Sequence, residues 1–274
     1  MPAAQTQPNT FSFNAAISAC EHSLQWQWAV LLLSEMAACK LSPDVVSFNA
    51  AIKTTEVGGQ WQMGLCLLSR MLASTTVPDQ ITFNTCISAC EKGLHWQHAL
   101  YLLATMPIAR AAPDEISYNA SISACEKGGQ WQIALCLLAA MHSEQLVRDV
   151  ISFSAAISAC EKGGEWQLAL ELLHEMPGAD VLPNEVTFNS AISACQKSGQ
   201  WQMPLQLLVD MAGARAMPDT VSFNATISAC EKGMQWLMAL CLLNSILYHP
   251  LELLFIFVHI KHPEDIQTKC CFFI

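Results

Sequence analysis

The apolar positions of the chain follow one long period. Aromatic rings recur every 35 residues, at Phe13, Phe48, Phe83, Tyr118, Phe153, Phe188 and Phe223. A tryptophan series keeps the same step, at Trp26, Trp61, Trp96, Trp131, Trp166, Trp201 and Trp236. A methionine series does so too, at Met36, Met71, Met106, Met141, Met176 and Met211. Three series with one step indicate internal repeats, and a period of this length is typical of solenoid proteins.

Each repeat contains two amphipathic stripes. In the repeat that spans residues 115–149, Tyr118, Ile122 and Cys125 are spaced i, i+4 and i+7, which places them on one face of a first helix. After a pair of glycines, a second apolar stripe begins at Trp131 and continues at i+3, i+4, i+7 and i+10. The pattern therefore predicts one helical hairpin in each repeat.

Proline followed by a capping residue separates the repeats. The pairs are Pro43-Asp44, Pro78-Asp79, Pro113-Asp114, Pro183-Asn184 and Pro218-Asp219. Proline ends the preceding helix, and Asp or Asn can cap the next one. One hairpin cannot bury both of its stripes, so we expect neighbouring hairpins to stack into an all-α solenoid with a concave face. The expected boundaries are an N-terminal segment 1–9, an array 10–245 with repeats beginning near residues 10, 45, 80, 115, 150, 185 and 220, and an irregular apolar tail 246–274.

Composition supports a continuous core and limits the possible ligands. Apolar residues make up 53% of the chain and charged residues 13%. The net charge of −10 argues against a general polyanion binder, so any basic surface has to be local. Six of the 13 cysteines share one core position, namely Cys20, Cys90, Cys125, Cys160, Cys195 and Cys230. Stacked hairpins lie about 10 Å apart, beyond the roughly 7 Å between Cα atoms that a disulfide tolerates. We expect reduced thiols packed in the core, with the tryptophan and methionine series packed there as well.

The repeat reads Pro-Asp-x-[Val/Ile]-[Ser/Thr]-Phe-Asn at its start and Ala-Leu-x-Leu-Leu-x-x-Met in its second helix. This 35-residue hairpin resembles the pentatricopeptide repeat over about residues 9–245, whereas the tetratricopeptide repeat has 34 residues and another signature. The resemblance implies a right-handed α-solenoid that binds single-stranded RNA as a non-enzymatic adaptor in organellar RNA processing, stability or editing. It also implies a chloroplast or mitochondrial location. The first ten residues show no transit peptide, so a cytoplasmic location stays open.

One polar residue recurs on the first helix in a way that the core does not explain. It is the asparagine directly after the ring in six of the seven repeats, at Asn14, Asn49, Asn84, Asn119, Asn189 and Asn224. In the fourth repeat Ile116, Asn119, Ser123 and Glu126 are spaced i, i+3, i+7 and i+10, so they share a face turned away from the ring. Helix propensity disfavours asparagine within a helix. An amide that both donates and accepts hydrogen bonds suits the edge of a base.

The resemblance implies specific base-reading pairs. They consist of the residue after the ring and the last residue of the repeat: Asn14 with Asp44, Asn49 with Asp79, Asn84 with Asp114, Asn119 with Asp149, Ser154 with Asn184, and Asn189 with Asp219. The Ser-Asn pair implies adenine and the five Asn-Asp pairs imply uracil, which gives U-U-U-U-A-U from 5′ to 3′; Asn224 receives no assignment. The residues implied to sandwich the bases are Val46, Ile81, Ile116, Ile151, Val186 and Val221, with Phe11 in that place in the first repeat.

A row of lysines recurs at the end of the first helix, at Lys92, Lys127, Lys162, Lys197 and Lys232. The resemblance implies phosphate contact for them. A cation at a helix C-terminus also stabilises the helix by itself, and that alternative stays open. A glutamate precedes most of these lysines and cancels part of their field. The first two repeats have His22 and Val57 instead, and Arg148 replaces the expected proline of one linker.

We expect no catalysis, cofactor, metal site or small-molecule substrate. The tail contains His262-Pro263-Glu264 and Cys270-Cys271, but adjacent cysteines do not match the spacing of a zinc deaminase. Residues 239–260 are apolar but interrupted, so membrane insertion is not expected. Two alternatives to RNA binding remain: a protein-protein scaffold that uses the same groove for possible protein partners, and a subunit whose catalytic domain lies beyond this chain.

Overall fold

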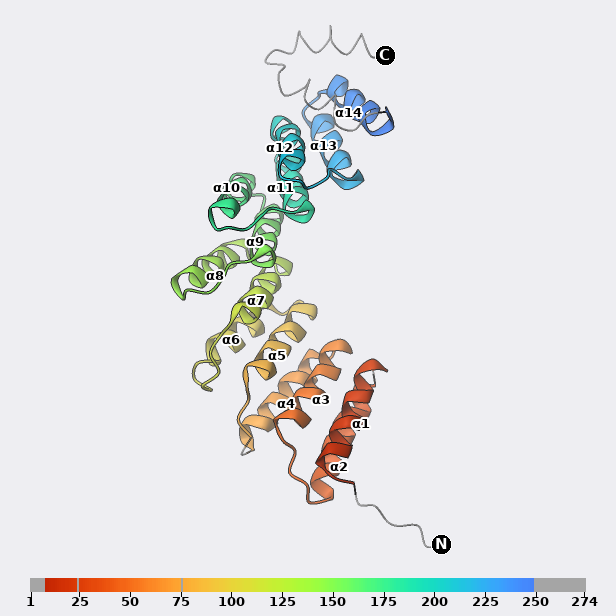
Figure 1. Ribbon diagram of the computed structural model, residues 1–274, viewed down its shortest axis with the longest axis vertical. Coiled ribbons are helices and arrows are strands. Elements are labelled where there is room, and N and C mark those ends of the chain that lie inside the picture. Colours follow the sequence, from red (N-terminus) through yellow and green to blue (C-terminus); the bar gives the residue numbers. More distant parts are fainter. Residues whose placement is uncertain (1–7, 24, 75, 249–274) are drawn as a thin grey trace. The chain divides into compact units, whose positions relative to one another are not determined.

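The computed structural model describes residues 8–23, 25–74 and 76–248 of the chain (Figure 1). Within these residues all regular secondary structure is α-helical, and fourteen helices follow one another in hairpins. The all-α repeat fold expected from the period is confirmed. The chain divides into two compact parts, Met1–Gly128 and Gly129–Ile274.

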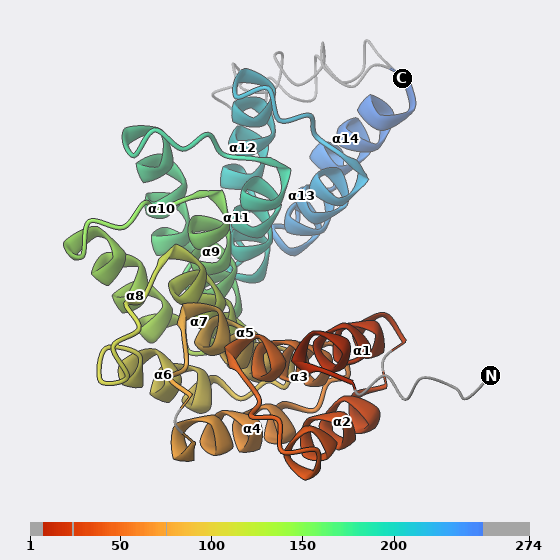
Figure 2. The same cartoon turned by 60° about the horizontal axis from the view of Figure 1, so that its bottom comes forward.

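The first part holds three helical hairpins and the first helix of a fourth. Its helices are α1 (Thr10–His22), α2 (Trp26–Ala38), α3 (Val45–Val57), α4 (Trp61–Ala73), α5 (Gln80–Lys92), α6 (Trp96–Thr105) and α7 (Glu115–Lys127). The first helices α1, α3, α5 and α7 pack side by side in sequence order. Each second helix packs against the first helix of its own hairpin and against that of the next, so that α2, α4 and α6 cover one side of the row (Figure 2).

The second part repeats this arrangement within itself. Its helices are α8 (Trp131–Ser143), α9 (Val150–Gly163), α10 (Trp166–Gly178), α11 (Glu185–Lys197), α12 (Gln202–Gly213), α13 (Thr220–Lys232) and α14 (Trp236–Tyr248). Here α9, α11 and α13 form the row of first helices. The helices α8, α10 and α12 each contact the first helix that follows them, and α14 packs on α13.

Side-chain caps fix where each first helix begins. The carboxylate of Asp44 accepts a hydrogen bond from the backbone N–H of Ser47 at 2.8 Å, and the Ser47 hydroxyl in turn accepts from the backbone N–H of Asp44. Asp79, Asp114, Asn184 and Asp219 make the same reciprocal cap at later first helices. Asp149 caps α9 by accepting from the backbone N–H of Ser152, and Asn9 caps α1 by accepting from that of Ser12. Such caps satisfy backbone donors that a helix leaves unpaired at its N-terminus. The capping role predicted for the Asp and Asn of the Pro-Asp motif is confirmed.

The core is built from the repeating apolar series. All seven rings from Phe13 to Phe223 are buried, and all six methionines of the series are fully buried. The repeating cysteines are free thiols, of which all but the half-buried Cys20 are buried. Burial raises the pKa of Cys90, Cys125, Cys160, Cys195 and Cys230 to about 11. These thiols are therefore neutral packing groups, as the sequence predicts.

The tryptophans lie elsewhere than the sequence predicts. They are half-buried instead of core residues, and Trp236 is 66% exposed. Each tryptophan starts a second helix or stands just before one, so its indole lies at the edge of the hairpin. Five of these indoles approach the glycine that follows or ends the first helix of the next repeat, as Trp61 does at Gly93 and Trp131 does at Gly163. The indoles thus join neighbouring repeats.

Candidate nucleic-acid interface

A large aliphatic side chain stands exposed near the start of each first helix from α3 onward. Its exposed fraction ranges from 56% at Val221 to 63% at Ile81 and Ile116. Val46, Ile151 and Val186 lie within that range, and Phe11 of α1 is 80% exposed. These are the residues that the resemblance assigns to base sandwiching. Each offers apolar surface to a flat ligand.

The asparagine one turn further along is joined to the Asp that caps the next first helix. In the first part, Nδ2 donates to a carboxylate oxygen at 3.3 Å from Asn14 to Asp44, 3.1 Å from Asn49 to Asp79, and 3.0 Å from Asn84 to Asp114. In the second part, Asn189 donates to Asp219 at 3.4 Å. The two members of each pair are 30 residues apart in sequence, and the fold brings them together. These four asparagine residues remain partly exposed, although Oδ1 of Asn84 is itself buried.

A hydroxyl from the capping box fixes the other side of the amide. Ser47 donates to Oδ1 of Asn14, Thr82 to Oδ1 of Asn49, and Ser222 to Oδ1 of Asn189, each at 2.6 Å. Sequence reasoning missed these residues as part of the site, although the Ser or Thr of the repeat motif was the available signal. The hydroxyl orients the amide with Nδ2 toward the carboxylate. A carbonyl oxygen has two lone pairs, so Oδ1 can still accept from a ligand.

The third repeat departs from this arrangement. Ser117 donates to the backbone carbonyl of Asp114 at 2.8 Å instead of to Asn84. Among the residues that the structure describes, Oδ1 of Asn84 is buried without a hydrogen-bond partner. The amide of Asn84 is therefore held on one side only, by Asp114.

The carboxylates of Asp44, Asp79 and Asp219 are ionised at neutral pH, because the pKa of each is lowered. Burial of Asp44 and Asp79 opposes ionisation, but hydrogen bonds from the following Ser or Thr and from the paired asparagine outweigh it and lower the pKa. For Asp219 the backbone N–H of Ser222 is the main cause, and the pKa is lowered again. Hydrogen bonds donated to the charged form favour that form. The face therefore presents fixed negative charges beside amide donors.

Each of the other residues predicted to read bases has its own surroundings. Ser154 donates to the backbone carbonyl of Val150 in its own helix at 2.5 Å, and Asn184 accepts from the backbone N–H of Thr187 at 3.0 Å. Asn119 belongs to the first part, and Asp149 to the second, where it caps α9. Asn224 is exposed on α13.

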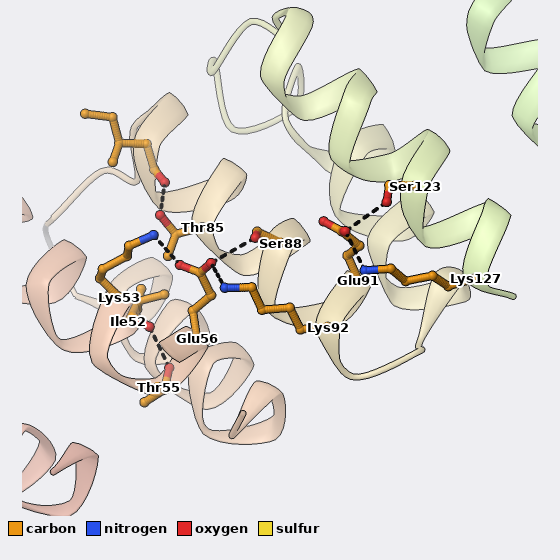
Figure 3. A network of polar contacts seen from close by, with 11 residues as sticks. Ile52, Lys53, Thr55, Glu56, Thr85, Ser88, Glu91, Lys92, Ser123 and Lys127 are labelled. Carbon is orange, nitrogen blue, oxygen red and sulfur yellow. Dashed lines mark hydrogen bonds and ion pairs between the residues drawn. The ribbon is translucent and has the colours of Figure 1, made fainter. Parts of the chain in front are cut away.

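Three lysines of the row form ion pairs with glutamates of the preceding repeat, and Figure 3 shows two of these pairs. Nζ lies 2.7 Å from a carboxylate oxygen between Lys92 and Glu56, 2.8 Å between Lys127 and Glu91, and 3.0 Å between Lys197 and Glu161. Each partner stands 36 residues before its lysine and on the preceding first helix. Phosphate contact, which the resemblance implies for these lysines, would therefore compete with an existing ion pair. Lys162 is exposed on α9.

A serine completes each of these contacts. Ser88 donates to Glu56 at 2.9 Å, and Ser123 donates to Glu91 at 2.8 Å (Figure 3). In the second part, Ser193 donates to Glu161 at 2.7 Å. Burial disfavours the charged form of Glu56, whose side chain is 3% exposed, but hydrogen bonds from Lys53, Lys92 and Ser88 outweigh burial and lower its pKa. Glu56 is therefore a fixed negative charge.

Two other features of the chain concern metals and membranes. In the part of the chain that the structure describes, no cluster of three His, Cys, Asp or Glu side chains is placed to hold a metal ion. None of the described helices combines the length and apolar character needed to cross a bilayer. The His262-Pro263-Glu264 and Cys270-Cys271 motifs lie outside the described residues, as does the end of the apolar stretch 239–260.

Known repeat families match parts of the chain. A PPR repeat family model matches residues 148–197, and a PPR repeat model matches residues 11–41 and 186–214. No match is found among curated proteins.

Solved structures share the fold at low sequence identity. The pentatricopeptide repeat protein PPR10 from maize superposes with a TM-score of 0.59 at 17% identity, over 93% of this chain and 41% of PPR10. PPR10 in complex with an 18-nt psaJ RNA element gives a TM-score of 0.54 at 17% identity, over 90% of this chain and 41% of that one. The PPR domain of Arabidopsis thaliana PRORP1 in complex with tRNA gives 0.57 at 12% identity, over 66% of this chain and 95% of that domain. The chain thus spans about two fifths of the length of PPR10.

Proposed function

The chain is a pentatricopeptide-repeat protein, and we propose that it binds single-stranded RNA along its row of first helices, one nucleotide to each repeat. The observation that carries this proposal is the Asn-Asp pair beside an exposed aliphatic side chain, as at Asn49, Asp79 and Ile81. The same group recurs at the repeat period in both parts of the chain. Reading one base per helical repeat is an established mode of RNA recognition.

The geometry of the pair suits the edge of a pyrimidine. Uracil presents an N–H donor between two carbonyl acceptors, and an amide can match one of each. In the second repeat, Thr82 and Asp79 hold the amide of Asn49 in one orientation before any ligand arrives. Pre-orientation lowers the entropy cost of binding. The exposed side chain of Ile81 supplies apolar contact to the flat face of the base.

The proposed target strand is U-U-U-U-A-U, with the 5′ end at the first repeat. Five Asn-Asp pairs are assigned to uracil, and the pair formed by Ser154 and Asn184 is assigned to adenine. RNA is also the ligand named for two of the similar structures, a psaJ element for PPR10 and a tRNA for the PRORP1 domain. We further propose, on the strength of the family alone, that the target is an organellar transcript that the bound chain shields, remodels or presents to other factors.

The test is binding to RNA of defined sequence. Fluorescence anisotropy with U-U-U-U-A-U should give a lower Kd than a strand in which the A and a central U are exchanged. Asn49→Ala should weaken binding and reduce the preference for uracil at the second nucleotide. Gln62→Ala, on the exposed side of α4, is the matched control and should leave binding unchanged. Equal affinity for the two strands contradicts the base assignment.

A protein-protein scaffold remains the second candidate, because the ion pairs reduce the positive charge of the lysine row. Glu56, Glu91 and Glu161 neutralise Lys92, Lys127 and Lys197, and the chain as a whole carries a net charge of −10. Capture of a random RNA pool followed by sequencing of the bound fraction separates the two candidates. Recovery of U-rich sequences supports RNA binding, whereas absence of any enriched RNA supports the scaffold.

A further inference from the structure

A single substitution interrupts the row of glutamates that hold the lysines. Glu56, Glu91 and Glu161 stand at one position near the end of successive first helices, and in the sixth repeat that position is Gln196. The amide of Gln196 donates to Ser228 at 2.8 Å, so it keeps the serine contact of the other repeats. It brings no negative charge to the lysine that follows.

The lysine opposite Gln196 is consequently different from the others. Nζ of Lys232 donates to the backbone carbonyl of Gln196 at 3.2 Å, and among the described residues Lys232 forms no ion pair. Glu231 is its neighbour in sequence, but adjacent residues of a helix point in different directions. Lys232 is exposed, and the side chains of Lys92 and Lys197 are nearly half exposed as well, at 49% and 46%. Lys232 therefore differs from Lys92 and Lys197 in its hydrogen-bond partner, which is a neutral carbonyl instead of a carboxylate, and not in its exposure to solvent.

We infer that the glutamates compete internally with RNA phosphates for the lysine row, and that Gln196 makes Lys232 the main phosphate contact of this row. The inference rests on the proposed RNA binding. A phosphate that approaches Lys127 has to displace the carboxylate of Glu91 and then remains beside it. The two negative groups repel each other, which offsets the new attraction. At Lys232 a phosphate replaces only a neutral carbonyl and gains the full charge interaction.

The expected size of the effect follows from ion-pair and counterion arguments. A solvent-exposed ion pair changes an equilibrium by up to about fivefold, so each glutamate should weaken the corresponding phosphate contact by a factor of that order. A lysine that neutralises one phosphate of a single strand contributes about 0.7 to the slope of log K against log salt. Lys232 should therefore contribute about 0.7, and Lys127 should contribute much less.

The first experiment compares two lysines at matching helix ends. The full chain is titrated with an RNA of sequence U-U-U-U-A-U followed by a short uridine tract, at a series of KCl concentrations. Lys232→Gln should lower the slope by about 0.7, whereas Lys127→Gln should leave it nearly unchanged. Equal losses for the two variants, or no loss for Lys232→Gln, overturn the inference.

The second experiment exchanges the acidic and neutral partners. Glu91→Gln should release Lys127, raise the salt slope by about 0.7, and tighten binding by two- to fivefold, on the order of one ion pair. Gln196→Glu should have the opposite effect and resemble Lys232→Gln. A slope that Glu91→Gln leaves unchanged contradicts competition by the glutamates.

A measurement without RNA separates this inference from the proposed function. Acetylation of lysine amines in the full chain, followed by mass spectrometry, should modify Lys232 faster than Lys127 and Lys197, because a carboxylate held against Nζ of Lys127 and Lys197 restricts the approach of the reagent. Glu91→Gln should accelerate the modification of Lys127. If labelling behaves in this way but the wild-type chain binds no RNA, the proposed function fails while the ion-pair arrangement stands. Equal acetylation rates for Lys232, Lys127 and Lys197 overturn the inference, whether or not the chain binds RNA.

Discussion

The indole of Trp96 closes directly over Gly128. A Cβ atom built on Gly128 would lie 2.3 Å from Cδ1 of Trp96, closer than any side chain tolerates. The corresponding distance is 2.7 Å between Trp61 and Gly93, and 2.4 Å between Trp201 and Gly233. The glycine is thus required by the tryptophan of the preceding repeat, and the pair couples neighbouring hairpins.

Replacing this glycine should destabilise the array. Gly128→Ala forces the indole of Trp96 away and should cost about 1–3 kcal/mol of unfolding free energy, the usual range for overpacking. Urea unfolding followed by circular dichroism gives the value. Gly213→Ala is the control, since a Cβ there meets nothing within 4 Å. If both variants unfold at the same urea concentration, the contact between Trp96 and Gly128 contributes little.

A second backbone prediction concerns Leu94, which lies between the two helices of the third hairpin. Leu94 has φ of 63° and is 62% exposed, while Gly59 and Gly129 occupy the same place in other repeats with φ of 69° and 68°. A left-handed conformation costs a non-glycine residue roughly 1 kcal/mol. Leu94→Gly should therefore stabilise the chain by about 0.5–1 kcal/mol. Gly129→Ala should have the opposite effect, and thermal unfolding of both variants tests the pair.

The repeat period was sufficient to predict the helical hairpins and their core. Periodic rings and methionines, punctuated by Pro-Asp pairs, determine where helices start and which faces are buried, because both depend on local sequence. Phe83 and Met71 are buried as this reasoning requires. The tryptophans were misplaced because an apolar residue at the first position of a helix fits an amphipathic stripe equally well in the core or at its edge.

Contacts between repeats could not be predicted from the period. Glu91 and Lys92 are adjacent in sequence, yet Glu91 pairs with Lys127 and Lys92 pairs with Glu56. Neighbouring residues of a helix do not face each other, and the partner is set by how the next helix packs. The hydroxyl of Thr82 was overlooked for the same reason, because its contact with Asn49 spans 33 residues. Periodicity identifies recurring residues but does not show which of them meet.

Stability should fall in acid because several carboxylates have a lowered pKa in the folded chain. Asp44, Asp79, Asp219 and Glu56 each bind protons less readily when folded. Their stabilisation is therefore complete above the unfolded pKa of about 4 and is lost as the pH falls through the lower folded values. Urea midpoints measured from neutral pH into this acidic range should decrease. In the Asp79→Asn variant the asparagine should still cap α5, as Asn184 caps α11 in the natural sequence. The urea midpoint of this variant should therefore decrease less in acid than that of the wild-type chain.

The hydroxyl of Thr82 should affect base discrimination at the second nucleotide. Thr82→Val keeps the side-chain volume but removes the donor to Oδ1 of Asn49 and the hydroxyl of the capping box. The lost hydrogen bonds should cost about 1 kcal/mol each in unfolding free energy. With the amide no longer fixed, the ratio of Kd values for strands with uracil and cytosine at the second nucleotide should move toward one.

Ser117→Ala is the matched control for this substitution. Its hydroxyl donates to the backbone of Asp114 and not to Asn84, so its removal should leave discrimination at the third nucleotide unchanged. Loss of discrimination in both variants would show that the hydroxyl acts through the helix cap and not through orientation of the amide.

Arg148 should stabilise the fifth hairpin in place of the proline found in other linkers. Its guanidinium lies 2.6 Å from a carboxylate oxygen of Glu175 in α10 and 5.2 Å from the ring centroid of Phe153 in α9, so one side chain connects both helices. Arg148→Met keeps the apolar stem and removes the charge, and should cost about 1 kcal/mol of unfolding free energy. Glu175→Gln should cost less, because the carboxylate is nearly half exposed and the contact with Phe153 remains. The double variant gives the coupling energy between the two residues. A coupling of zero, with the full loss seen in Arg148→Met alone, would assign the effect to the aromatic contact instead of the ion pair.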